Sequence, residues 1–164
     1  MTKILIPYET SSGEARVSVT PDAVKKLKSL GCEVFVESSA GKLSGFSDFS
    51  YEDSGGQIIS KSDNEIWEEA DLIFCVQLPT EINLNRLKKG AILLGLLNPY
   101  GNMNLLEIIK NKKISALSLE LLPRISRAQS SDVLSSQANI AGYKAVLLAA
   151  SELDRYFPLL MTAA

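Results

Sequence analysis

The chain has 164 residues, of which 46% are apolar and 22% charged, with a formal net charge of −2. These values suit one domain with a substantial core and give no electrostatic reason to expect nucleic acid. Histidine is absent, which excludes Ser-His and Cys-His nucleophiles and histidine metal sites.

The first predicted elements form a strand–helix–strand unit. An apolar run over residues 4–6 predicts a strand. Thr20 followed by Pro21 is a strong helix start, since Thr is a good N-cap and Pro suits the first helical position. Gly31 predicts the helix end, and the β-branched and aromatic run over residues 33–37 predicts the next strand.

The same alternation continues downstream. Further strands are predicted over residues 57–60, 72–76, 91–97 and 114–119, and helices over residues 48–54, 64–70, 82–89 and 104–110. No hairpin signal such as Asn-Gly joins neighbouring strands. The pattern predicts an α/β fold with a doubly wound, mostly parallel sheet, of flavodoxin-like or Rossmann-like type.

From about Ser131 the apolar residues recur with helical spacing, which predicts a long helix that runs to about Phe157 and is stopped by Pro158. We therefore predict an α/β first lobe over residues 1–130 and a long C-terminal linker helix within residues 131–164. A small-residue stripe follows Ala141 on this helix. Two interpretations of the stripe stay open: ordinary core packing, or contact with a second domain or protomer.

The candidate site is the polar stretch over residues 123–132, which follows the last predicted strand and precedes the long helix. Ligand-binding groups in open α/β sheets lie at this kind of strand-to-helix turn. Arg124, Gln129 and Asp132 add a guanidinium, an amide and a carboxylate within nine residues. An ordinary capped connection is the alternative, but the density of rigid hydrogen-bonding groups favours a planar polar ligand.

The sequence lacks the motifs of several other kinds of binding site. There is no Gly-x-Gly-x-x-Gly, no phosphate-binding loop and no cysteine cluster for zinc, so no metal ligand is assigned. Cys32 and Cys75 are interpreted as small buried hydrophobes in a reduced, cytoplasmic setting. No apolar run reaches the roughly 18 residues of a membrane span, so direct membrane insertion is not expected.

These residues resemble a known family. The segment over residues 123–130, with Asp132, residues 134–136, Asn139 and residues 141–143, closely resembles the alpha subunit of proton-translocating NAD(P) transhydrogenases. The same family and the related alanine dehydrogenases are similar at Ile6-Pro7, Glu14, Arg16-Val17, Thr20-Pro21 and Met161 to Ala164.

The resemblance implies that the chain is the first lobe of an NAD(H)-binding component, with NAD(H) held in a cleft shared with a second lobe. The activity implied is Si-specific, proton-translocating transhydrogenation, in which hydride passes from NADH to NADP+. The implied partners are the second lobe, the NADP-binding and membrane components, and a second copy in a homodimer. The isolated chain is expected to be inactive, and cytoplasmic but peripheral to the inner membrane through its partners.

The resemblance also implies which residues contact the cofactor. They lie in the loop before the long helix: Arg124, Ile125, Ser126, Gln129, Asp132 and Ser135. No catalytic residue is expected, because hydride transfer between nicotinamides needs no protein acid or base.

Two alternatives are an alanine dehydrogenase-like domain and a non-catalytic dimerisation or interaction module. In alanine dehydrogenases an Arg, a Lys and a His line the first lobe. Arg16 matches the Arg, but Gln77 stands at the Lys position and no His exists. Arg16 is interpreted either as that ligand or as half of a structural ion pair with Glu14 or Glu9.

Overall fold

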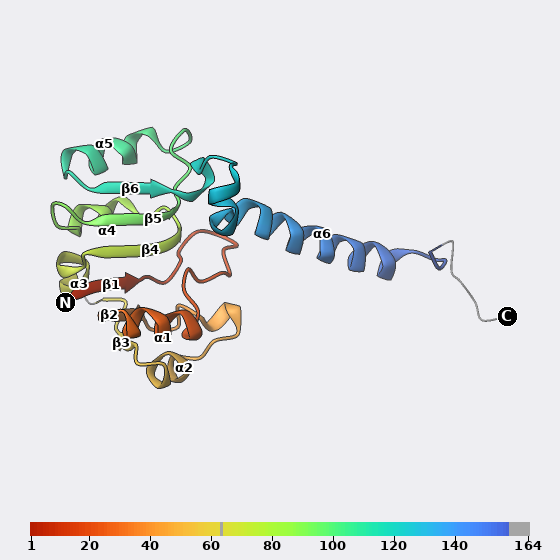
Figure 1. Cartoon of the computed structure of the whole chain (residues 1–164), viewed down its shortest axis with the longest axis horizontal. Coiled ribbons are helices and arrows are strands. Elements are labelled where there is room, and N and C mark those ends of the chain that lie inside the picture. Colours follow the sequence, from red (N-terminus) through yellow and green to blue (C-terminus); the bar gives the residue numbers. More distant parts are fainter. Residues whose placement is uncertain (63, 158–164) are drawn as a thin grey trace. The chain divides into compact units, whose positions relative to one another are not determined.

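Six parallel strands form one sheet in the computed structural model, which describes residues 1–62 and 64–157. The strands are β1 (Thr2–Ile6), β2 (Cys32–Glu37), β3 (Gln57–Ile59), β4 (Leu72–Gln77), β5 (Ile92–Leu96) and β6 (Ser115–Ser118). Their order across the sheet is β3-β2-β1-β4-β5-β6 (Figure 1). The predicted doubly wound α/β fold is therefore confirmed, and the strand order reverses between β1 and β4.

Short helices connect the strands. They are α1 (Pro21–Ser29), α2 (Asp48–Asp53), α3 (Asn64–Glu69), α4 (Glu81–Arg86) and α5 (Met103–Asn111), with a 3-10 turn η1 (Lys42–Ser44) before α2. Thr20 caps α1 as predicted, because its hydroxyl accepts a bond from the Ala23 N–H at 3.4 Å. Gly31 follows the helix with φ of 82°, a left-handed conformation that favours glycine.

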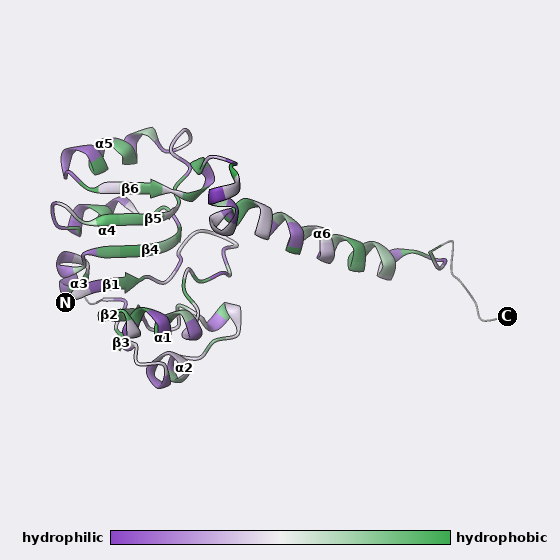
Figure 2. Cartoon of the chain, in the orientation of Figure 1, coloured by the Kyte–Doolittle hydropathy of each residue, from purple (hydrophilic) through white to green (hydrophobic). Residues whose placement is uncertain are grey.

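Apolar side chains form a core on each face of the sheet. Successive strand residues point to opposite faces, so Leu5 and Ile6 of β1 enter different clusters. Leu5 joins residues of α3, α4 and α5, including the fully buried Leu84. Ile6 joins residues of α1 and α2, including Tyr51. Strands β4 and β5 are correspondingly hydrophobic in Figure 2, as expected for inner strands of a parallel sheet covered on both sides.

A buried carboxylate connects β1, β2 and α3. Glu37, the last residue of β2, is 5% exposed. Its oxygens accept bonds from the Tyr8 N–H and from the Trp67 indole N–H, both at 2.8 Å. Burial raises the pKa of Glu37, and the two accepted hydrogen bonds oppose this rise. The first part of the chain thus contains a buried acidic group that the sequence pattern does not reveal.

The pairing of β4 with β5 contains a β-bulge. Phe74 pairs with Leu94 and Gln77 with Leu96, so two residues of β4 face Gly95 alone. A Cβ at Gly95 would lie 2.5 Å from the Cys75 carbonyl oxygen, which explains why glycine stands there. Cys75 is buried, as predicted, whereas Cys32 is only half-buried. Both cysteines are free thiols.

The chain divides into two compact units, Met1–Leu121 and Leu122–Ala164. The first unit ends with the 3-10 turn η2 (Leu119–Leu121), and the second holds the 3-10 turn η3 (Ser126–Ser131) and helix α6 (Val133–Glu152). The boundary between residues 130 and 131, predicted from the sequence, stays a prediction.

Helix α6 is shorter than predicted. It ends at Glu152 rather than near Phe157, because Leu153 is extended with φ −85° and ψ 124°. Its 20 residues correspond to about 30 Å instead of about 40 Å. Pro158, the predicted stop, and Met161 to Ala164, which contribute to the family resemblance, lie outside the described residues.

Apolar residues occur along much of α6 (Figure 2), yet none of its residues is buried. Ile140 and Tyr143 are 61% and 69% exposed. A helix that is apolar on all sides is normally covered. The described chain does not cover this one.

Candidate functional site

The loop between β6 and α6 takes its form from local sequence. Pro123 disfavours helix at Leu122, and the Ile125 N–H bonds back to the Pro123 carbonyl at 2.9 Å. The turn η3 then begins, with the Ala128 N–H donating to the Ile125 carbonyl at 2.9 Å. This series of tight turns keeps residues 122–135 close together without help from distant strands.

Asp132 ends this loop and caps α6. Its carboxylate accepts the Ser135 N–H at 3.0 Å and the Ser135 hydroxyl at 2.5 Å. The hydroxyl bond and then the backbone bond lower the pKa of Asp132, with a smaller contribution from the charge of Arg124. Asp132 therefore stays ionised and fixes the start of the helix.

A hollow of about 300 Å³ opens within the second unit. It is lined by Leu122, Pro123, Arg124, Ile125, Ser126, Ala128, Gln129, Asp132 and Ser135. All six predicted cofactor-contact residues lie in this lining. The volume is at the low end of the range for ligand pockets, so the hollow suits part of a larger ligand.

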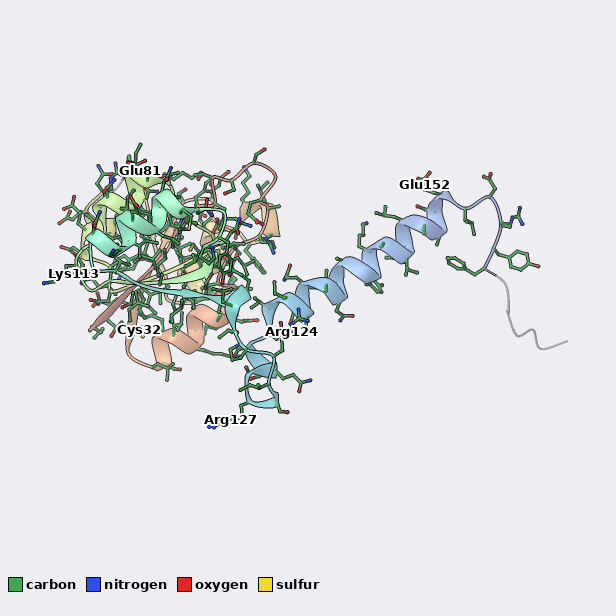
Figure 3. The ribbon with its side chains drawn as sticks, turned by 90° about the horizontal axis from the view of Figure 1, so that it is seen from above. Cys32, Glu81, Lys113, Arg124, Arg127 and Glu152 are labelled. Atoms are coloured by element: carbon green, nitrogen blue, oxygen red, sulfur yellow. The ribbon has the colours of Figure 1, made fainter. Side chains whose placement is uncertain are left out.

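Two side chains of the hollow have unused hydrogen-bonding groups. Arg124 and Gln129 form no side-chain hydrogen bond or ion pair with other residues in the described part of the chain. The amide of Gln129 offers both a donor and an acceptor, and the guanidinium of Arg124 offers five donors. Figure 3 labels Arg124 near the start of α6 and Arg127 at the outer end of the same loop. Arg127 does not line the hollow.

The bulge of β4 creates a second polar cluster, which sequence reasoning missed. Glu9 accepts bonds from the N–H groups of Val76 and Gln77, the latter at 3.1 Å. Burial raises the pKa of Glu9, and these two bonds oppose the rise. The adjoining crevice, where the strand order reverses, has a volume of only about 10 Å³. A carboxylate of the protein thus lies where many α/β proteins bind ligands.

Arg16 forms a structural ion pair with Glu14, one of the two interpretations above. Its Nε and Nη2 donate to the two Glu14 oxygens at 2.7 and 2.6 Å. Gln77 Nε2 also donates to Glu14 at 2.9 Å. Chiefly because of the Arg16 bonds, the pKa of Glu14 falls to about 2. The Glu14 carboxylate therefore occupies the Nε–Nη2 edge of the Arg16 guanidinium in a bidentate pair.

The carboxyl end of β6 carries two further polar groups. Glu120 Oε1 accepts the Asn98 N–H, which ties the turn after β5 to η2. Glu120 Oε2 and Ser118 Oγ are buried and have no hydrogen-bond partner among residues 1–62 and 64–157. Buried polar atoms are normally satisfied, so a partner such as water or ligand is expected at this edge.

The described ranges offer neither a metal site nor a membrane span. No group of three acidic, cysteine or histidine side chains within them is placed to hold a metal ion. Among the same residues, no helix combines the length and apolar character needed to cross a membrane.

The sequence matches the family model described as alanine dehydrogenase/PNT, N-terminal domain, over residues 5–141. It is 43% identical to an NAD(P) transhydrogenase alpha-subunit chain of Rhodospirillum rubrum, covering 99% of this chain and 43% of that protein. It is 32% identical to alanine dehydrogenase 1 of Staphylococcus aureus, covering 90% of this chain and 38% of that one. The chain thus spans less than half the length of these curated relatives.

Solved structures show the same pattern. The crystal structure of transhydrogenase from Sinorhizobium meliloti superposes with a TM-score of 0.88 at 41% identity, covering 98% of this chain and 48% of that one. A structure of L-alanine dehydrogenase superposes with a TM-score of 0.67 at 27% identity, covering 73% of this chain and 32% of that one.

Proposed function

Because this chain belongs to the alanine dehydrogenase/PNT N-terminal domain family, we propose that it is the first lobe of the NAD(H)-binding component of a proton-translocating NAD(P) transhydrogenase. The net reaction converts NADH and NADP+ into NAD+ and NADPH. Identity favours this branch of the family, at 43% to a transhydrogenase subunit against 32% to an alanine dehydrogenase. The observation that carries the proposal is the hollow at residues 122–135 with its unused Gln129 and Arg124 groups.

In this proposal the hollow receives the nicotinamide end of NAD(H). Gln129 pairs with the carboxamide, donating and accepting one bond each, and Arg124 donates to the carboxamide or to phosphate oxygens. Ile125 and Ser126 form the wall of the hollow, and Asp132 holds Ser135 at its edge. When bound, the nicotinamide supplies the hydride chemistry, so this chain only binds and orients.

The remaining parts of the proposal concern the assembly. Residues 1–130 form the first lobe and residues 131–164 the linker to a second lobe, which shares the cofactor. The NADP-binding and membrane components complete the enzyme, and a second copy of the chain forms a homodimer through the exposed surface of α6. The chain is cytoplasmic and peripheral to the inner membrane through these partners.

The proposal is tested with the chain extended past Ala164 through the second lobe and mixed with a supplied NADP-binding component. We expect NADH-dependent reduction of NADP+ by the extended chain, and none by residues 1–164 with the same component. If the extended chain binds NADH but transfers no hydride, the transhydrogenase assignment is wrong.

An alanine dehydrogenase activity is less well supported. A keto acid would meet an Arg16 guanidinium whose Nε and Nη2 already donate to the Glu14 carboxylate, which lowers its net attraction for a second carboxylate. Gln77 also lacks the charge and acidity of a lysine, and no histidine is present to move a proton.

A non-catalytic role as an interaction module is favoured by the exposed apolar residues of α6. Calorimetry with NADH on residues 1–164 separates the two roles of the isolated chain. We expect a dissociation constant no better than about millimolar, because half of the shared cleft is missing. Micromolar binding would contradict the claim that the cofactor site needs a second lobe.

A further inference from the structure

A second, larger hollow lies at the edge of the sheet where the strands begin. It has a volume of about 670 Å³ and lies between the turns that follow α4 and α5. Its lining is rich in charged residues: Glu68, Asn85, Arg86, Leu87, Lys88, Lys89, Asn111, Lys112 and Lys113. We call this set the basic hollow. It contains five cationic side chains against one anionic side chain, in a chain whose net charge is −2.

Internal contacts occupy two of these cations. Lys88 pairs with Asp71 at 2.6 Å, and Lys112 donates to the carbonyl oxygens of Asn85 and Leu87. Cations often stabilise helix C-termini in this way, so Lys112 needs no further explanation. The turns themselves are held together, because the Gly90 N–H donates to the Lys113 carbonyl at 3.1 Å.

Lys89 and Lys113 make no internal contact of the kind that Lys88 and Lys112 make within the described ranges. Both are exposed, and neither side chain bonds to another residue in the described ranges. Arg86 makes a bond only to the neutral Asn83 amide oxygen, at 3.2 Å, among the contacts of the described chain. Of the nearby acidic groups, Glu69 is paired with Lys3 and Asp71 with Lys88, so Glu68 alone supplies negative charge to the lining. Lys113 projects outward from the body of the first unit (Figure 3).

We propose that the basic hollow binds the phosphate groups of an anionic lipid surface. A single soluble phosphate is usually held by backbone N–H groups at a helix N-terminus, whereas α4 and α5 present their carbonyl ends here. Lysines on long flexible stems instead reach a plane that carries many phosphates. Only charges near the membrane act on it strongly, because salt screens the more distant ones, so the net negative charge of the whole chain weakens the contact little.

The test is co-sedimentation of the 164-residue chain with vesicles, either pure phosphatidylcholine or phosphatidylcholine with about one third phosphatidylglycerol. We expect binding to the anionic vesicles only, and loss of binding at high salt. The double variant Lys89→Gln/Lys113→Gln should lower the partition coefficient about 30-fold, at the usual contribution per lysine near an anionic surface.

The matched control is Lys25→Gln/Lys26→Gln on α1, which removes the same charge from another exposed site. It should bind like the unchanged chain, and all variants should keep the same melting temperature. Absence of binding to anionic vesicles, or an equal loss in the control, would overturn the proposal. Saturable micromolar binding of pyrophosphate, lost in Lys89→Gln/Lys113→Gln, would also overturn it in favour of a soluble phosphate ligand. These outcomes do not depend on the hydride-transfer proposal.

Discussion

If the proposed function holds, replacing Gln129 by Ala in the chain extended through the proposed second lobe slows hydride transfer from NADH about 30-fold. The amide can form two hydrogen bonds with a carboxamide, and bonds of this kind contribute about 1 kcal/mol each. Arg124→Ala should have an effect of similar size, because a guanidinium bond is charge-assisted. The measurement is the single-turnover rate with saturating NADP-binding component.

Folding effects can be separated from this result. The side chains of Gln129 and Arg124 bond to no other residue in the described chain, so their removal should leave the melting temperature unchanged. Arg127→Ala is the control, because Arg127 belongs to the same 3-10 turn but lies outside the lining of the hollow. Unchanged rates in both Gln129→Ala and Arg124→Ala would refute the role assigned to these residues.

Loss of the buried Glu37 carboxylate is expected to have the largest effect on stability. Glu37→Ala leaves the Tyr8 and Trp67 N–H groups without their acceptor, and each buried unsatisfied donor costs about 1–3 kcal/mol. Relief of the buried charge offsets part of this. We expect a net loss of about 3 kcal/mol in the free energy of unfolding by urea.

The Glu37→Ala result has two controls, an exposed carboxylate variant and the pH dependence of stability. Glu52→Ala removes an exposed carboxylate from α2 and should change stability by less than about 0.5 kcal/mol. The raised pKa of Glu37 means that the folded state binds the proton more tightly. The contribution of Glu37 to the free energy of unfolding is therefore fully present below its ordinary pKa of 4.5. That contribution is lost as pH rises through the higher pKa of the folded state. The gap between the unchanged chain and Glu37→Ala should narrow over that window, and a widening gap would contradict it.

The sequence predicted those elements whose form depends on interactions between residues close together in the chain. Thr20 and Pro21 start α1 because a cap and a fixed φ act within one turn. The hollow follows the same logic, since all its residues lie between Leu122 and Ser135 and tight turns bring them together. Whether NAD(H) contacts them stays a prediction.

Features that depend on distant pairing were not predictable in this way. The contact of Glu9 with Val76 spans 67 positions and exists only because β4 bulges opposite Gly95. Glu37 likewise meets Trp67 only after β2 and α3 are in place. Glu9 follows β1 by three residues and Glu37 ends β2, so neither position alone signals its distant partner. The early end of α6 had no stop signal in the sequence, because no Gly or Pro directly follows Glu152.

The most direct measurement is a crystal structure of the extended chain with NAD+. We predict that the nicotinamide carboxamide lies within hydrogen-bond distance of the Gln129 side chain, about 2.7–3.2 Å, with Arg124 beside it. A nicotinamide bound elsewhere, with Gln129 and Arg124 turned to solvent, would contradict the assignment of residues 122–135 as the first lobe's part of the cofactor site.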